Sequence, residues 1–165
     1  MFATYGYHGV SIEDLGAAVG ISGPGVYRHF PSKDALLADL LVGISDDLLE
    51  GGRLEVAAAG GPADALERLV DRHLAFSLAD PDLIRVHDRD LASLSTADGQ
   101  AVRRLQRAYV ELWVDQLVAV RSGEGRDEAR ARAHAAFGLL NSTPHQGRAP
   151  DAALLRAMAL AALYA

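Results

Sequence analysis

A dense set of helix start and stop signals over residues 10–41 constrains the fold of this chain most strongly. Ser11 and Asp14 form a capping-box pattern, in which the hydroxyl accepts a backbone N–H and the carboxylate reaches back, so a helix is expected to begin between them. Ser22 is expected to cap a second helix, and Pro24 is tolerated in its first turn because that turn has no intrahelical partner for the missing N–H. Two short helices so close together predict a helix-turn-helix.

The ends of these two helices and the start of a third are equally clear. Gly20 is expected to end the first helix in a left-handed conformation, Pro31 stops the second, and Ser32 starts the third. The third helix carries a leucine-rich stripe and is long enough to leave the small domain as a connector. It is expected to continue through Glu55, although the glycine pair at 51–52 weakens a helix there.

The run GVSIEDLGAAVGISGPGVYRHFPSKDALL resembles the DNA-binding domain of the TetR family of bacterial transcriptional regulators. The most specific part is Ser22 followed by Tyr27, Phe30, Ser32 and Lys33, and the resemblance covers about the first quarter of the chain. It implies a homodimer that binds a pseudo-palindromic operator, most simply as a repressor, and a helical body that binds a small-molecule effector. Relatives carry a fuller first helix, so the first helix here, and any basic residues before it, are expected to be truncated.

The second helix of such a motif enters the major groove, where its N-terminal residues meet bases and phosphates. Its N-terminus offers a hydroxyl and backbone N–H groups, small residues allow close approach, and an arginine can read guanine or hold a phosphate. The resemblance assigns Lys33 to a backbone phosphate, whereas Ser11 has capping as its alternative role. The candidate DNA-binding residues are Ser11, Ser22, Gly23, Pro24, Gly25, Tyr27, Arg28, His29 and Lys33.

The charge of the chain argues weakly against DNA. The formal net charge is −6, and within residues 1–41 only Arg28 and Lys33 oppose four acidic residues. A basic footprint is the usual sign of nucleic-acid binding. The sequence therefore leaves open an alternative, a helical ligand carrier or interaction module whose helix-turn-helix no longer binds DNA.

Composition indicates an all-α protein, with a helix-turn-helix domain over residues 1–41 and a helical ligand-binding and dimerisation domain over 42–165. Hydrophobic residues make up 50% of the chain, alanine and leucine are abundant, and β-branched and aromatic residues are few. There is no cysteine, no apolar run long enough for a membrane span and no signal-peptide pattern, which favours a cytoplasmic protein. Phosphate-loop and nucleophile-elbow motifs are also absent, so no enzyme activity, catalytic residue or cofactor is predicted.

Further helices are expected over residues 62–78, 83–94, 100–121, 127–140 and from 151 to the C-terminus. Several polar or aromatic side chains interrupt their apolar faces: His73, Phe76, His87, Tyr109, Trp113, Phe137 and Asn141. The resemblance implies that they line a mostly apolar effector pocket, whereas the simpler alternative is a set of satisfied core residues. Acyl chains, aromatic metabolites and drugs all fit such a pocket, and a fatty-acyl or acyl-CoA effector is one hypothesis. His73 and His87 lack a third ligand at helical spacing, so no metal site is predicted.

The last two helices, separated by a turn-forming segment over 141–150, are rich in alanine with leucine interleaved. Small residues let helices approach closely, which suits a four-helix interface between two copies, as the resemblance also implies. The alternative is that these helices only cover the core of a monomer. The candidate dimer-interface residues are Ala133, Ala136, Phe137, Leu140, Leu154, Leu155, Met158 and Ala162.

Overall fold

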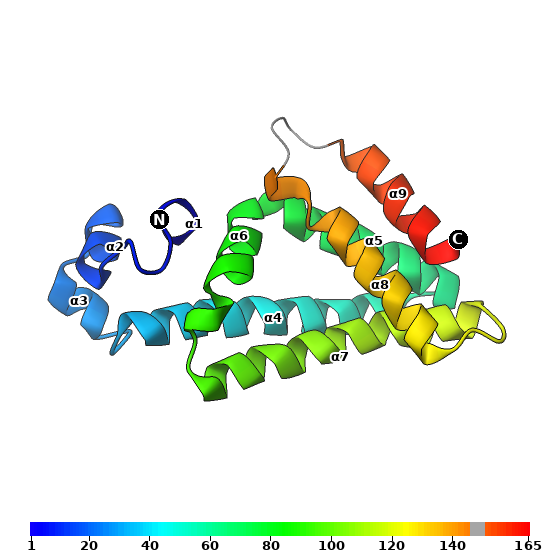
Figure 1. Ribbon diagram of the computed structural model, residues 1–165, viewed down its shortest axis with the longest axis horizontal. Coiled ribbons are helices and arrows are strands. Elements are labelled where there is room, and N and C mark those ends of the chain that lie inside the picture. Colours follow the sequence, from blue (N-terminus) through cyan, green and yellow to red (C-terminus); the bar gives the residue numbers. More distant parts are fainter. Residues whose placement is uncertain (146–150) are drawn as a thin grey trace.

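The computed structural model describes residues 1–145 and 151–165, and the regular structure in these ranges is entirely helical (Figure 1). This confirms the predicted all-α fold, with a small head, a connector helix and a helical body. Two short 3₁₀ turns cover Leu91–Ser93 and Thr143–His145. Of the turn predicted over 141–150, only residues 141–145 lie within the described residues. The α-helices are α1 (Phe2–Tyr5), α2 (Ile12–Ala18), α3 (Gly23–Tyr27), α4 (Lys33–Ala58), α5 (Pro62–Ala79), α6 (Pro81–Asp90), α7 (Thr96–Val120), α8 (Arg126–Leu140) and α9 (Ala152–Tyr164).

The helix starts in the head follow the sequence signals. The Ser11 hydroxyl accepts the Asp14 backbone N–H at 3.1 Å, and the Asp14 carboxylate accepts the Ser11 backbone N–H at 2.9 Å, which completes the capping box. Ser22 and Ser32 each accept a hydrogen bond from the backbone N–H three residues later, at 3.3 and 3.1 Å. Gly20 has φ +73°, the left-handed conformation expected just past the end of α2.

The helix α4 forms the long axis of the molecule (Figure 1). It begins in the head and runs beside α7 into the body, where α5, α8 and α9 pack around the same core. The predicted domain boundary at residue 41 therefore falls inside a continuous helix. Among the described residues, no helix is long and apolar enough to cross a membrane.

The two glycines in the middle of α4 permit close helix packing rather than ending the helix. A Cβ atom on Gly52 would lie 2.7 Å from Cε2 of Tyr109, so a larger residue would push α7 away. A Cβ atom on Gly51 would overlap the guanidinium of Arg72, which reaches across α4 and donates to the Asp47 carbonyl at 3.0 Å. The α4 helix continues to Ala58 because packing outweighs the low helix propensity of glycine.

A second apolar core joins the head to the body. Phe2, Tyr7 and Leu41 are buried against Val86 of α6 and Val102 of α7. This cluster brings the N-terminal residues, the start of α4 and two helices of the body into one packed unit. The head is therefore attached to the body at α6 as well as through α4.

Polar contacts reinforce this junction at the C-terminal end of α6. The guanidinium of Arg89 donates to the carbonyl oxygens of Phe2 and, at 3.3 Å, of Ala3. The carboxylate of Asp90, only 4% exposed, accepts the backbone N–H of Tyr7 at 3.3 Å and the Arg89 Nε–H at 3.0 Å. We call these four contacts the Arg89–Asp90 clasp.

Lys33, the only lysine of the chain, stabilises the head through hydrogen bonds within it. Its ammonium donates to the carbonyl oxygens of Tyr7 and Val10, both at 2.8 Å, and lies 4.2 Å from the centre of the Tyr7 ring. The first turn of α4 is thereby bound to the segment between α1 and α2. Hydrogen bonds from a charged group are each worth about 1.5–3 kcal/mol.

Replacing this ammonium should therefore destabilise the protein. We expect Lys33→Met to lower the free energy of unfolding by about 3 kcal/mol or more, because two partly buried carbonyl oxygens lose their charged donor. Urea unfolding followed by circular dichroism measures this loss. The control is Arg53→Met, which removes an exposed cation of the same helix and should change stability by less than about 0.5 kcal/mol. Equal stability of Lys33→Met and wild type would contradict the role given to Lys33.

Candidate functional site

The α2–α3 pair presents most of the predicted DNA-binding residues to solvent. Gly16 of α2 allows α3 to approach closely, since a Cβ atom there would lie 2.7 Å from Cγ2 of Val26. Tyr27, which is 48% exposed, closes α3, and its hydroxyl lies 3.4 Å from the Glu13 carboxylate. Ser22, Pro24, Arg28 and His29 are exposed, while Gly23 and Gly25 are half-buried.

Besides Tyr27, whose hydroxyl donates to Glu13, two more of the predicted DNA contacts are engaged within the protein. The Ser11 hydroxyl donates to the Asp14 carboxylate at 2.6 Å in addition to capping α2, so its only proton is used. The Lys33 ammonium donates two of its three N–H groups to the carbonyl oxygens of Tyr7 and Val10. That Ser11 and Lys33 bind DNA phosphates remains a prediction. Arg28 is the arginine that this surface exposes to solvent.

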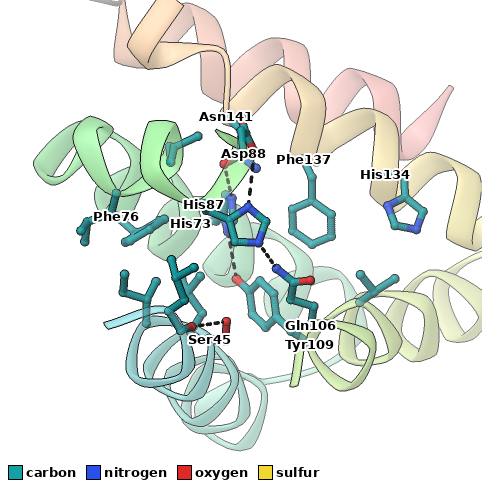
Figure 2. A pocket seen from close by; sticks show the side chains of 16 residues that line it. Ser45, His73, Phe76, His87, Asp88, Gln106, Tyr109, His134, Phe137 and Asn141 are labelled. Atoms are coloured by element: carbon teal, nitrogen blue, oxygen red, sulfur yellow. Dashed lines mark hydrogen bonds and ion pairs between the residues drawn. The ribbon is translucent and has the colours of Figure 1, made fainter. Parts of the chain in front are cut away.

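A cavity of about 260 Å³ lies in the body, partly open to solvent and lined by α4, α5, α6, α7 and α8 (Figure 2). Six of the seven side chains predicted for an effector pocket line it, although they come from four different helices or their ends. The lining residues are Leu41, Ile44, Ser45, Leu48, His73, Phe76, Leu83, Ile84, His87, Asp88, Gln106, Tyr109, Val110, His134, Phe137 and Asn141.

The seventh, Trp113, lies behind this wall. It is fully buried, and its ring centre is 4.8 Å from that of Phe137 and 6.1 Å from that of Tyr109. Trp113 therefore supports two lining residues without reaching the cavity itself. Its position one turn beyond Tyr109 on α7 explains the prediction, because both share one apolar face.

His73 is held in a buried polar chain that links three helices. Its Nε2 lies 3.0 Å from Oδ1 of Asn141, at the end of α8, and its Nδ1 lies 3.3 Å from the hydroxyl of Tyr109 on α7. The Asn141 oxygen can only accept, so Nε2 carries the proton and Nδ1 accepts from Tyr109. Burial lowers the pKa of His73 to about 4 and raises that of Tyr109, so both side chains are uncharged at neutral pH.

A second polar group, centred on His87 of α6, lies on another wall of the cavity (Figure 2). The Gln106 amide nitrogen donates to Nε2 of His87, and the Nδ1–H of His87 donates to the Asp88 carboxylate at 3.3 Å. Both ring nitrogens of His87 are thus engaged. Among the described residues, no three acidic or histidine side chains converge to hold a metal ion.

Sequence reasoning missed the contribution of α4 to the cavity. Leu41, Ile44, Ser45 and Leu48 form one wall, and the sequence showed them only as part of the stripe of a connector helix. It also missed Gln106 and His134, because the sequence predicted that their sides of α7 and α8 face solvent. The sequence signal for this wall was Ser45, a polar residue within an apolar helical stripe, because such a residue often faces a cavity.

Five of the eight residues predicted for the dimer interface pack within the chain itself. Ala133, Ala136 and Leu140 are 0% exposed and Leu155 is 6% exposed, because they pack α8 and α9 onto α5 and α7 within the chain. Phe137 lines the cavity instead. The small residues predicted to meet a partner therefore serve the chain's own core.

The opposite sides of α8 and α9 are free to meet a partner. Leu154 is 54% exposed, Met158 is 42% exposed, and Ala162 is half-buried, so these three predicted residues remain candidates. Exposed small residues continue the surface on both helices: Ala131, Ala135, Gly138, Ala157 and Ala161. Exposed apolar residues gathered on two neighbouring helices are typical of protein–protein interfaces.

Comparisons with known proteins agree with this arrangement. Residues 1–40 match the model of bacterial regulatory proteins of the tetR family, and residues 59–160 match the tetracyclin repressor-like C-terminal domain. The chain is 30% identical over 129 residues to the HTH-type transcriptional regulator CymR of Pseudomonas putida, covering 75% of this chain and 62% of that protein. It is 28% identical over 131 residues to the HTH-type transcriptional repressor KstR2 of Rhodococcus jostii (strain RHA1), covering 78% and 64% respectively. The chain thus spans less than two thirds of the length of these curated relatives.

A solved structure shows the same fold over nearly the whole chain. The crystal structure of a TetR-family transcriptional regulator from Bordetella parapertussis 12822 matches with a TM-score of 0.85 at 27% sequence identity. The match covers 99% of this chain and 86% of that one.

The burial of His73 predicts a specific pH dependence of stability. Unfolding returns its pKa from about 4 to 6.5, so the unfolded chain binds the extra proton between these values, and stability falls as the pH drops through this window. We expect the free energy of unfolding of wild type to fall more steeply than that of His73→Gln, by about 1 kcal/mol per pH unit. Urea titrations at several pH values measure both slopes. Parallel profiles of the two proteins would contradict the buried, uncharged state of His73.

Proposed function

This chain belongs to the TetR family of bacterial regulatory proteins, and we propose that it is a transcriptional repressor released from its operator by a small molecule. The observation that carries the proposal is that α4 and α6 each contact both the head and the cavity. A ligand in the cavity and DNA at the head would therefore act on the same two helices. A repressor of this kind would act in the bacterial cytoplasm.

The head supplies the DNA contacts in this proposal. The first turn of α3 would approach the major groove, with Ser22, Tyr27, Arg28 and His29 exposed to bases and phosphates. Arg28 carries the main charged contact, since Lys33 is engaged inside the head. The small number of cations predicts a shallow salt dependence of binding.

Dimerisation would use the outward sides of α8 and α9. Leu154 and Met158, with the exposed alanines around them, would form the centre of a two-fold interface. A two-fold dimer carries two heads and reads two half-sites of a pseudo-palindromic operator. The separation of the heads then decides whether both half-sites are bound.

Effector binding would change that separation through two links. On α6, the cavity residues His87 and Asp88 directly precede the Arg89–Asp90 clasp, which holds residues Phe2 to Tyr7. The second link involves α4: Tyr109 of α7 lines the cavity and also packs against Gly52 of α4. The ligand shifts DNA affinity only by the difference in its own affinity for the two arrangements.

A second function, a helical ligand carrier whose head does not bind DNA, is favoured by one observation. Within residues 1–41, four acidic residues oppose Arg28 and Lys33, and Lys33 lies within the head. The two functions differ in whether the protein selects one DNA sequence.

Fluorescence anisotropy with DNA from upstream of the gene, across a salt series and with scrambled DNA as competitor, separates them. We expect selective binding that weakens with salt, and Arg28→Ala should weaken it about tenfold or more and change the salt slope by about one unit if Arg28 holds a phosphate. Arg53→Ala, which removes a cation far from the head, is the control and should bind as wild type does. No selectivity at any salt, from folded dimeric protein, would refute the repressor and support the carrier.

A further inference from the structure

We propose that the cavity takes an uncharged, mostly apolar small molecule whose polar end is a hydrogen-bond acceptor, such as a ketone carbonyl. This inference rests on the proposed function, because it names the chemical class of the effector. It is carried by three properties of the cavity: its size, the charges around it and the hydrogen-bonding groups left over within it.

The size and the walls favour a compact hydrocarbon body. The cavity of about 260 Å³ lies just below the range of roughly 300–1,000 Å³ typical of sites for drug-sized ligands. Most of the wall is aliphatic or aromatic, supplied by α4, α5, α6, α7 and α8. The apolar wall consists of Leu41, Ile44, Leu48, Phe76, Leu83, Ile84, Val110 and Phe137.

The charges around the cavity disfavour an anion. Among the described lining residues there is no lysine or arginine, and the single carboxylate belongs to Asp88. His73 is uncharged, and His87 already faces Asp88. A carboxylate ligand would therefore lose its hydration without meeting a lysine or an arginine, and His134, the remaining lining histidine, is exposed, so water would screen an ion pair with it.

A cation is disfavoured as well. The Asp88 side chain is 57% exposed and already accepts the Nδ1–H of His87, so an ammonium would meet a carboxylate that is screened by water and partly engaged. An uncharged ligand avoids both costs.

The unused hydrogen-bonding groups select an acceptor. In the described part of the chain, the Asn141 side-chain nitrogen donates to nothing, while its oxygen accepts from His73. Gln106 uses one of its two N–H donors on His87. The hydroxyl protons of Tyr109 and Ser45 are spent on His73 and on the Leu41 carbonyl. Asn141 and Gln106 are half-buried, so their free N–H groups can donate to a ligand oxygen that enters the cavity, and an acceptor complements these donors better than a second donor would.

The groove next to the cavity argues against a coenzyme A thioester. It shares the walls Ile44, Leu48, Phe76 and Leu83 with the cavity, so a long ligand would leave through it. Its charged residues are Asp47, Glu55, Asp80 and Arg72, three carboxylates against one guanidinium. The phosphates of coenzyme A would meet net repulsion there, which disfavours the acyl-CoA hypothesis.

The test uses matched probes and the only tryptophan of the chain as reporter. Trp113 stacks edge-on against Phe137, a lining residue, so occupation of the cavity should change its fluorescence. The probes are the methyl-ketone, carboxylate and aminomethyl derivatives of tert-butylbenzene and of octane, together with octanoyl-coenzyme A. We expect at least one ketone to bind about tenfold or more tightly than its matched carboxylate and amine and than the thioester.

Asn141→Asp sharpens the test, because the new carboxylate still accepts from His73 but no longer donates to the ligand. Ketone affinity should fall about tenfold, and the amine should gain relative to the ketone. The control is Gln100→Glu, which adds the same charge at an exposed position outside the cavity.

Tighter binding of a carboxylate or of the thioester, binding of no probe, or an unchanged ketone affinity in Asn141→Asp would overturn the inference. These titrations contain no DNA, so they are independent of the operator assay. A protein that binds ketones but no operator would refute the repressor and keep this inference, whereas one that binds the operator but prefers carboxylates would refute this inference alone.

Discussion

The position of the head depends on one buried carboxylate at the end of α6. Asp90 is 4% exposed and is stable there only while the backbone N–H of Tyr7 and the guanidinium of Arg89 donate to it. Arg89 in turn holds the carbonyl oxygens of Phe2 and Ala3. Any movement of α6 must therefore either carry the N-terminal residues along or expose a carboxylate that has lost its donors. The clasp lies directly after the cavity residues His87 and Asp88, so the cavity and the head share one short helix.

A second constraint comes from the close contact between α4 and α7. Gly52 leaves room for the ring of Tyr109, and the hydroxyl of the same tyrosine donates to His73 inside the body. The connector helix thus rests on a side chain that also faces the cavity. Because packed interfaces of this kind adopt discrete arrangements rather than deforming continuously, a ligand that displaces Tyr109 would favour another placement of α4. The two links give the proposed regulation a physical path in both α4 and α6.

The sequence predicted what depends on local signals and missed what depends on distant partners. Helix limits followed from Ser11, Ser22 and Gly20 because caps act within four residues. The pocket side chains were identified because polar residues interrupting apolar helix faces can converge. Lys33 and the clasp were not foreseen, since their partners lie 23–26 and 83–87 residues away in the sequence. Several residues predicted for the dimer interface, such as Ala133, pack in the chain's own core, because a small residue in the core has the same sequence pattern as one that meets a partner.

We propose that the cavity and the head form one thermodynamic unit, and the linkage between ligand binding and DNA binding tests this. If a ligand weakens DNA binding, DNA must weaken ligand binding by the same factor. The measurement is the dissociation constant of the best-binding ketone, from Trp113 fluorescence, with and without saturating operator, in wild type and in Arg89→Ala. We predict that the operator weakens ketone binding about fivefold or more in wild type, and that the effect is much smaller once the clasp is removed. An equal ketone affinity with and without operator in wild type would contradict the account.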